Sequence, residues 1–198
     1  MPRAVSSKEA FAKSVHAAIR GLWTGNTDQF TFIDSMISTI TRYLGQAFDA
    51  GAATQNVTPA DYTQQEKDAR KDYINQQFQF LPGFSQRIQN GNKANDGKLQ
   101  KWLNQGDNWV NRWEGAFEVA KVAVGDNVPM EWELGPTEHC PSCQKLAGKV
   151  KRKNWWYENG ILPAQAGATY LKCGGHKCQC QLVKTDKPLS RGRMPNLP

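Results

Sequence analysis

The sequence lacks long hydrophobic runs and has few histidines, and both features limit the classes of protein to which it can belong. No stretch of about 18 apolar residues occurs in the 198-residue chain, so we expect no membrane-spanning helix and no membrane partner. The opening residues MPRAVSSKEAFAKS carry no apolar segment of the kind that a secretory signal needs, which favours synthesis in a reducing cytoplasm. The three histidines, at positions 16, 139 and 176, form no grouping with Glu or Arg that suits a nuclease or transferase site. We therefore expect a protein without enzymatic activity.

The positive charge is concentrated at one end of the chain. The formal net charge is +7, and residues 145–198 contain eleven Lys or Arg against two acidic residues. The preceding 144 residues contain fourteen against sixteen and are slightly acidic. A basic end suits contact with nucleic acid or with an acidic protein surface, and the alternative is a solvated face that keeps the protein soluble.

The first two-thirds of the sequence predicts helices. Apolar residues recur at helical spacing over residues 11–22, 30–48 and 99–124, and Gly125 is expected to end the last of these helices. Between the second and the last segment, the Thr-Pro pair at 58–59 predicts the start of another helix, because Thr favours the cap position and Pro the first turn.

The pattern changes near residue 126. Residues 130–134 alternate apolar and acidic side chains, which predicts a strand with Met130, Trp132 and Leu134 inward and Glu131 and Glu133 outward. Two further strands are expected at residues 149–151 and 178–184, and one helical turn is expected at residues 154–160.

These patterns predict an α+β protein in three parts. Residues 1–125 form a mainly helical region of three to five helices. Residues 126–184 form a small Cys-rich module with a short antiparallel sheet. Residues 185–198 are basic, rich in proline and poor in apolar residues, so we expect an extended tail.

All five cysteines lie in the predicted module. Cys140 and Cys143 form a Cys-x-x-Cys pair, whose spacing lets both sulfur atoms reach one ion, and thiolate and imidazole are the ligands that zinc prefers. Gly174 and Gly175 permit a second tight turn next to the later cysteines. We predict a structural zinc site that holds together a module with a small core. The expected ligands are Cys140, Cys143, Cys173 and Cys178, with Cys180 as the first substitute and His176 as the second.

Other uses of these residues stay open. His139, next to the first pair, is expected to lie beside the site or on the surface. Disulfides would replace the metal if the protein leaves the cell. A redox use of Cys-Pro-Ser-Cys would need a following long helix in a βαβ unit. A catalytic thiol would need a basic partner histidine. The surrounding residues favour neither use.

The segments WELGPTEHCPSCQKLAGKVKRKNWW, NGILP and LKCGGHKCQCQL carry a more specific pattern. It resembles the C-terminal module of head-morphogenesis (minor head) proteins of tailed bacteriophages, the Mu F-like family. The resemblance covers roughly residues 126–184. His176 departs from the pattern, because the family has an aromatic residue there. The matching residues are Trp132, Glu138, Cys140, Cys143, Leu146, Gly148, Val150, Trp155, Pro163, Leu171, Cys173, Gly174, Gly175, Cys178, Cys180 and Leu182.

The resemblance implies a structural virion protein that is made in the host cytoplasm and acts in capsid assembly or at the portal vertex. It implies portal or capsid proteins as partners, several copies in a symmetric assembly, and packaged double-stranded DNA as a further contact. The alternative function is a zinc-ribbon-type nucleic-acid-binding protein. The basic residues expected to contact DNA or a partner are Lys149, Lys151, Arg152, Lys153, Lys184, Lys187, Arg191 and Arg193.

Overall fold

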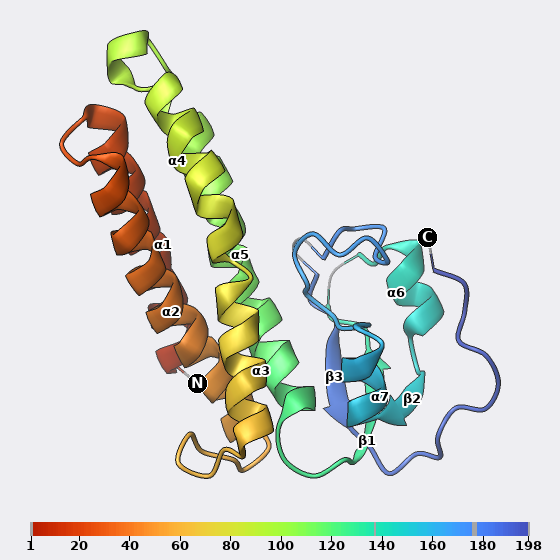
Figure 1. The fold of residues 1–198 in the computed structure, drawn as a ribbon. Coiled ribbons are helices and arrows are strands. Elements are labelled where there is room, and N and C mark those ends of the chain that lie inside the picture. Colours follow the sequence, from red (N-terminus) through yellow and green to blue (C-terminus); the bar gives the residue numbers. More distant parts are fainter. Residues whose placement is uncertain (1, 137, 176–177, 198) are drawn as a thin grey trace. The chain divides into compact units, whose positions relative to one another are not determined.

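The computed structural model describes residues 2–136, 138–175 and 178–197, which are mainly helical with a small antiparallel sheet near the C-terminal end (Figure 1). The predicted α+β fold is therefore confirmed. No helix in this part of the chain combines the length and the hydrophobicity that a membrane span requires. The first elements are α1 (Pro2–Thr24), α2 (Gln29–Ala53), α3 (Gln64–Asn75), η1 (Phe78–Phe80), α4 (Leu81–Asn90), η2 (Lys93–Asn95) and α5 (Leu99–Ala123). The later elements are β1 (Pro129–Glu133), α6 (Pro141–Leu146), β2 (Val150–Arg152), α7 (Lys153–Glu158) and β3 (Gln181–Lys184).

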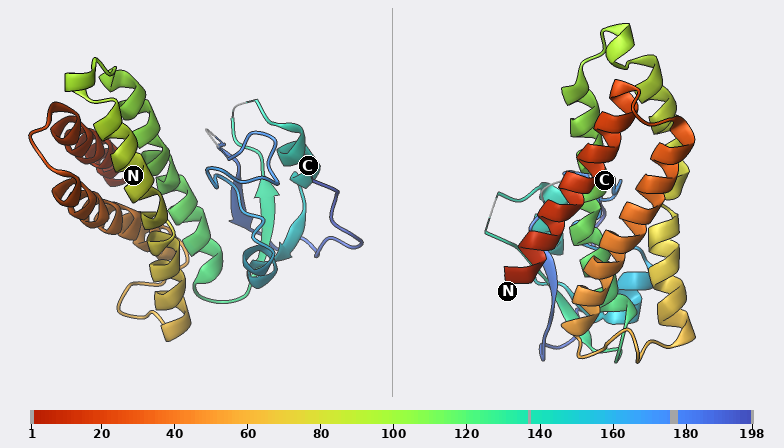
Figure 2. Two further views of the ribbon diagram at one scale, coloured as in Figure 1. Left: turned by 45° about the horizontal axis from the view of Figure 1, so that its top comes forward. Right: turned by 90° about the vertical axis from the view of Figure 1, so that its left-hand side faces the viewer.

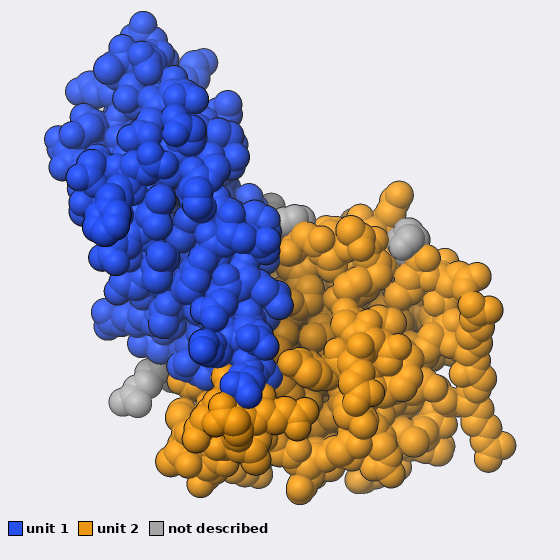
Figure 3. Space-filling view, viewed as in Figure 1, with its two compact units in different colours: residues 1–47, 68–113 blue, residues 48–67, 114–198 orange. Residues whose placement is uncertain are grey.

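The chain divides into two compact units (Figure 3). Unit 1 comprises residues 1–47 and 68–113, and unit 2 comprises residues 48–67 and 114–198. The helical segments of unit 1 lie side by side, and their apolar stripes meet in a shared core (Figure 2). Side chains buried in this core include Phe11, Val15, Ile19, Met36, Ile40, Phe84 and Ile88.

The third helix begins later than the sequence predicts. The pair at 58–59 is not its cap, because α3 begins at Gln64. Thr63 Oγ1 accepts a hydrogen bond from Glu66 N at 3.3 Å, and a carboxylate oxygen of Glu66 accepts one from Thr63 N at 2.7 Å. This reciprocal pair satisfies two N–H groups that a helix start otherwise leaves without partners. The capping box therefore sets the boundary, and the prediction of a Thr-Pro start is wrong.

The sheet of unit 2 has the strand order β2-β1-β3 and is antiparallel throughout. Met130 and Trp132 of β1 are fully buried, as the alternation predicts. The alternation is wrong at two positions. Leu134 lies beyond the strand and is exposed, and Glu131 is buried, with its carboxylate accepting a hydrogen bond from Lys187 Nζ at 2.7 Å.

The remaining elements of unit 2 follow the prediction with shifted boundaries. The strand expected at 178–184 begins only at residue 181, so the last two cysteines precede β3 and are not part of it. The helical turn expected at 154–160 is α7. Its Trp156 packs against Trp132, with ring centroids 5.9 Å apart, and donates a hydrogen bond from Nε1 to Met130 O at 3.1 Å.

The described residues of the C-terminal tail, 185–197, contain neither helix nor strand. Ser190 N donates to Val150 O, and Ser190 Oγ accepts from Val150 N, each at 2.9 Å. Lys151 Nζ also donates to Ser190 O at 2.9 Å. These bonds attach the tail to the outer edge of β2 and satisfy backbone groups that an edge strand otherwise leaves open.

Lys153 is a predicted surface contact that the structure buries. Its side chain is inside unit 2, where Nζ donates a hydrogen bond to Val124 O at 3.0 Å. Burial lowers the pKa of this ammonium group to about 8, although the negative charges of Asp126 and Glu66 oppose the shift. Lys153 is therefore not available to DNA or to a partner, and that part of the prediction is wrong.

We expect Lys153 to make unit 2 more stable as the pH rises from about 8 toward 10.5, its ordinary pKa. In this range the unfolded chain keeps the proton on Lys153 while the folded chain has released it, and stability increases with pH wherever the unfolded state binds more protons. Urea denaturation across this range should show a steeper rise for the natural chain than for Lys153→Met. The exposed Lys98→Met is the matched control, and identical pH dependence in all three proteins would contradict the expectation.

Candidate metal centre

The first cysteine pair is positioned by the start of helix α6. Cys140 is the N-cap residue with extended backbone, and Pro141 follows in the first turn. The helical turn brings Cys143 back toward Cys140, so that the two Sγ atoms are 3.5 Å apart. Pro141 favours this arrangement because its fixed φ suits the first helical position. Ser142 Oγ accepts a hydrogen bond from Lys172 N at 2.9 Å, which links α6 to the segment that carries the later cysteines.

A tight turn made by two glycines lies between Cys173 and the last two cysteines, Cys178 and Cys180. Gly174 and Gly175 have φ of +61° and +70°, a backbone conformation that side chains with a Cβ rarely adopt. A Cβ on Gly175 would also collide with the backbone oxygen of Gln165. The turn directs Cys173 toward the first pair, as the sequence predicts.

All five cysteines converge and are free thiols. The Sγ atoms of Cys140, Cys143 and Cys173 lie within 4.8 Å of one another, and so do those of Cys143, Cys178 and Cys180. Cys143 belongs to both triads and is buried, and its Sγ is 3.9 Å from that of Cys178. The structure thus brings together five of the six predicted ligands into a cluster that could hold a metal ion. The sixth, His176, lies outside the described residues.

Hydrogen bonds within the cluster divide the thiols into donors and acceptors. Bonds from the Cys143 and Cys178 thiols and from the Gly135 N–H lower the pKa of Cys180 to about 3, although burial opposes this. Donation to Cys178 and Cys180 correspondingly raises the pKa of Cys143. The buried Trp132 Nε1–H makes no hydrogen bond of ordinary length in the described residues, but it is close enough to Cys180 to favour the thiolate.

The pKa values of Cys140 and Cys173 are also shifted in opposite directions. Burial disfavours the thiolate of Cys140, but N–H groups of Cys143 and Cys173 point at its sulfur and lower its pKa to about 7. Burial raises the pKa of Cys173 to about 11, although the N–H of Gly175 opposes the shift. Backbone N–H groups therefore favour the thiolate at particular sulfur atoms, and thiolate is the form that binds metal.

Comparisons with family models, with curated proteins and with solved structures found no match to this chain. The resemblance to the Mu F-like family therefore rests on the sequence motifs alone.

His139 lies beside the cysteine cluster, which is one of the two places that the sequence predicts for it. Its Nδ1 is 3.6 Å from Cys180 Sγ, and its Nε2 is 2.9 Å from Gly135 O. Gly135 packs so tightly against Gln179 that a Cβ would collide with the backbone oxygen of that residue. In the sequence, Gly135 and His139 both lie shortly before Cys140. Their positions alone do not predict the hydrogen bond between them or the contact of His139 with Cys180.

A buried ion pair supports the strand that follows the cluster. Glu118 and Lys121 lie one turn apart on α5, and Lys121 Nζ is 3.0 Å from a carboxylate oxygen of Glu118. The other oxygen accepts a hydrogen bond from Leu182 N at 3.2 Å, two residues after Cys180. Burial raises the pKa of the Glu118 carboxyl, and the Lys121 charge opposes the shift. The sequence does not reveal this pair, because the spacing of Glu and Lys in a helix does not show that they are buried.

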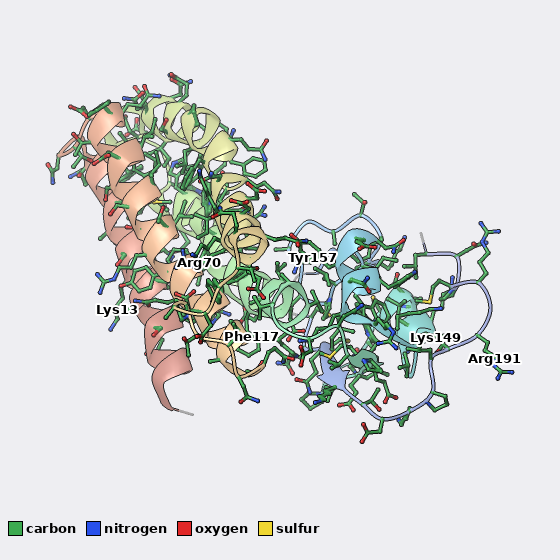
Figure 4. The ribbon with its side chains drawn as sticks, turned by 60° about the horizontal axis from the view of Figure 1, so that its bottom comes forward. Lys13, Arg70, Phe117, Lys149, Tyr157 and Arg191 are labelled. Carbon is green, nitrogen blue, oxygen red and sulfur yellow. The ribbon has the colours of Figure 1, made fainter. Side chains whose placement is uncertain are left out.

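Several basic residues that were predicted to contact DNA or a partner form hydrogen bonds or ion pairs within unit 2. Lys151 binds Ser190, Lys187 pairs with Glu131, and Arg152 Nη1 donates to Asn127 O at 2.9 Å. Figure 4 shows Lys149, and Arg191 on the C-terminal segment. Lys149 is half-buried, whereas the exposed basic residues of the predicted set are Arg152, Lys184, Lys187, Arg191 and Arg193.

Proposed function

We propose that this chain is a structural, non-enzymatic protein of a tailed-bacteriophage virion, of the minor-head or head-morphogenesis type, with a zinc-stabilised unit 2. The observation that carries the proposal is the convergence of two cysteine segments, 140–143 and 173–180, into one cluster. These are the segments whose spacing resembles the phage family.

The donor set suits zinc in a structural role. Sulfur atoms around one tetrahedral zinc ion are roughly 3.8 Å apart, since each Zn–S bond is about 2.3 Å long. The two separations of 3.5 and 3.9 Å around Cys143 lie close to this value. Soft thiolates favour zinc over magnesium or calcium, which prefer oxygen ligands. Cys140, Cys143, Cys173 and Cys178 are the proposed ligands, and Cys180 is the substitute.

The proposed role of the ion is to stabilise a sheet with little core of its own. Strands β1, β2 and β3 have five, three and four residues. Small modules of this kind usually need a metal or disulfides, because they bury too little apolar surface. A clip between α6 and the segment before β3 joins the connection that follows β1 to the connection that precedes β3.

The exposed basic residues are proposed to bind an acidic surface of a portal or capsid protein, with packaged DNA as a further contact. Lys184, Arg191 and Arg193 are exposed, and Arg191 and Arg193 lie on the tail that follows the sheet. Their charge favours both kinds of partner, since Lys and Arg gain affinity for DNA by releasing counterions from phosphate.

The proposal predicts that the chain is incorporated into phage particles. Mass spectrometry of purified particles from a phage that encodes it should detect the chain in both full heads and DNA-free heads, because protein contacts recruit it. Cys143→Ser should reduce incorporation at least tenfold, whereas Gln144→Ser, an exposed neighbour on α6, should not.

Two outcomes would count against this proposal. Absence of the chain from every particle would overturn the virion role. Presence only in full heads, together with salt-sensitive DNA binding by the purified chain, would favour the nucleic-acid-binding alternative.

A further inference from the structure

The five sulfur atoms do not surround one point. They form two triads that share Cys143, and within each triad every pair of sulfur atoms is at most 4.8 Å apart. A zinc ion has four tetrahedral positions, so a single ion binds at most four of the five sulfur atoms and leaves at least one thiol without a metal. In the described residues, the geometry therefore offers two ion positions with one sulfur atom in common.

His139 lies beside the second triad, where its ring contacts Cys180. The backbone oxygen of Gly135 can only accept a hydrogen bond, so His139 Nε2 must donate its proton at the 2.9 Å separation. In the neutral ring, Nδ1 then carries the free lone pair, and this atom is 3.6 Å from Cys180 Sγ. Histidines that bind metal usually donate their other ring N–H to a carbonyl or carboxylate in this way. His139 is thus already in the tautomer that a metal requires.

We propose that the cluster binds two zinc ions that share the Cys143 sulfur, an inference that rests on the proposed zinc binding. One ion is held by Cys143, Cys178, Cys180 and His139, which completes a tetrahedral set of three thiolates and one imidazole. The other is held by Cys140, Cys143 and Cys173, with its fourth position open to water or another donor.

The charges favour the shared arrangement. Five thiolates and two divalent ions have a net charge of −1, whereas one ion with four thiolates has a net charge of −2. A smaller net charge costs less to bury, and both Cys143 and Cys180 are buried. Binding releases the thiol protons to solvent, and no oxidation takes place.

The experiment is metal analysis of the purified full-length chain after saturation with zinc, by elemental analysis and native mass spectrometry. We expect two ions per chain. His139→Ala and Cys140→Ser should each retain one ion, and His16→Ala, which alters a histidine paired with Asp107 in unit 1, should retain two. One ion per chain, unchanged by His139→Ala, would overturn the inference and leave the single-zinc proposal intact. No bound ion would overturn both.

Cobalt substitution gives a readout that does not depend on the folding of a variant. Two cobalt ions bridged by one thiolate couple magnetically. The EPR signal of the natural chain should therefore rise with the first equivalent of cobalt and weaken with the second. A signal that grows in proportion to both equivalents would show that the ions are not bridged by Cys143, and would overturn the shared site.

Discussion

Chelation of the proposed zinc is expected to unfold the sheet of unit 2 while the helices of unit 1 stay folded. Structural zinc contributes on the order of 10 kcal/mol to small zinc-dependent domains, which is comparable to the whole stability of a typical domain. Unit 1 has its own buried core and contains no cysteine. Hydrogen exchange followed by mass spectrometry should show that peptides of β1, β2 and β3 lose protection after chelation, while those of α1 and α4 keep it.

Cys143→Ser should have the same effect without chelator, because this residue belongs to both triads. Its control is Gln144→Ser, which changes an exposed side chain on the same helix and should leave exchange unaltered. If β1 keeps its protection after elemental analysis has verified loss of zinc, the metal does not hold the sheet together. Retained protection in Cys143→Ser would lead to the same conclusion.

The fold class and most elements could be predicted from the sequence because local patterns determine them. Apolar spacing identified α1, α2 and α5, and the alternation of apolar and acidic residues identified β1, whose Met130 and Trp132 are buried. Boundaries were less predictable where two local signals compete. Residues 58–59 carry a plausible helix start, but the reciprocal bonds of Thr63 and Glu66 satisfy more N–H groups. The charge of Glu131 indicated an outward side chain, and only the fold shows that Lys187 reaches it.

The cysteine site was predictable in composition but not in arrangement. Spacing alone indicated that Cys140 and Cys143 reach one point, because the two residues are close in the chain. It could not show that Cys143 is common to two triads, since this depends on how two distant segments approach each other. The sequence places His139 next to Cys140, but it cannot show that Nε2 bonds to Gly135 O while Nδ1 faces Cys180. Long-range geometry of this kind leaves no periodic signal in a sequence.

The buried pair of Glu118 and Lys121 shows how much such long-range geometry contributes to stability. Both side chains are almost fully buried, and the carboxylate also holds the N–H of Leu182 in β3. Loss of one member would leave the other charge in a low-dielectric interior without its partner. The pair also lies next to the segment that carries Cys180 into the cysteine cluster, so its loss would affect the strand that follows this segment.

Glu118→Leu is therefore expected to lower the free energy of unfolding of unit 2 by roughly 3–5 kcal/mol, measured by urea denaturation of the zinc-loaded protein. The double variant Glu118→Leu with Lys121→Leu should recover most of this loss, because it leaves no charge unpaired. What remains should be about 1–3 kcal/mol, the cost of a buried Leu182 N–H without an acceptor. Glu118→Gln should fall between the two, since its amide oxygen can still accept from Leu182. If the single variant is no less stable than the double variant, the ion pair does not stabilise unit 2, and the support of β3 must come from packing alone.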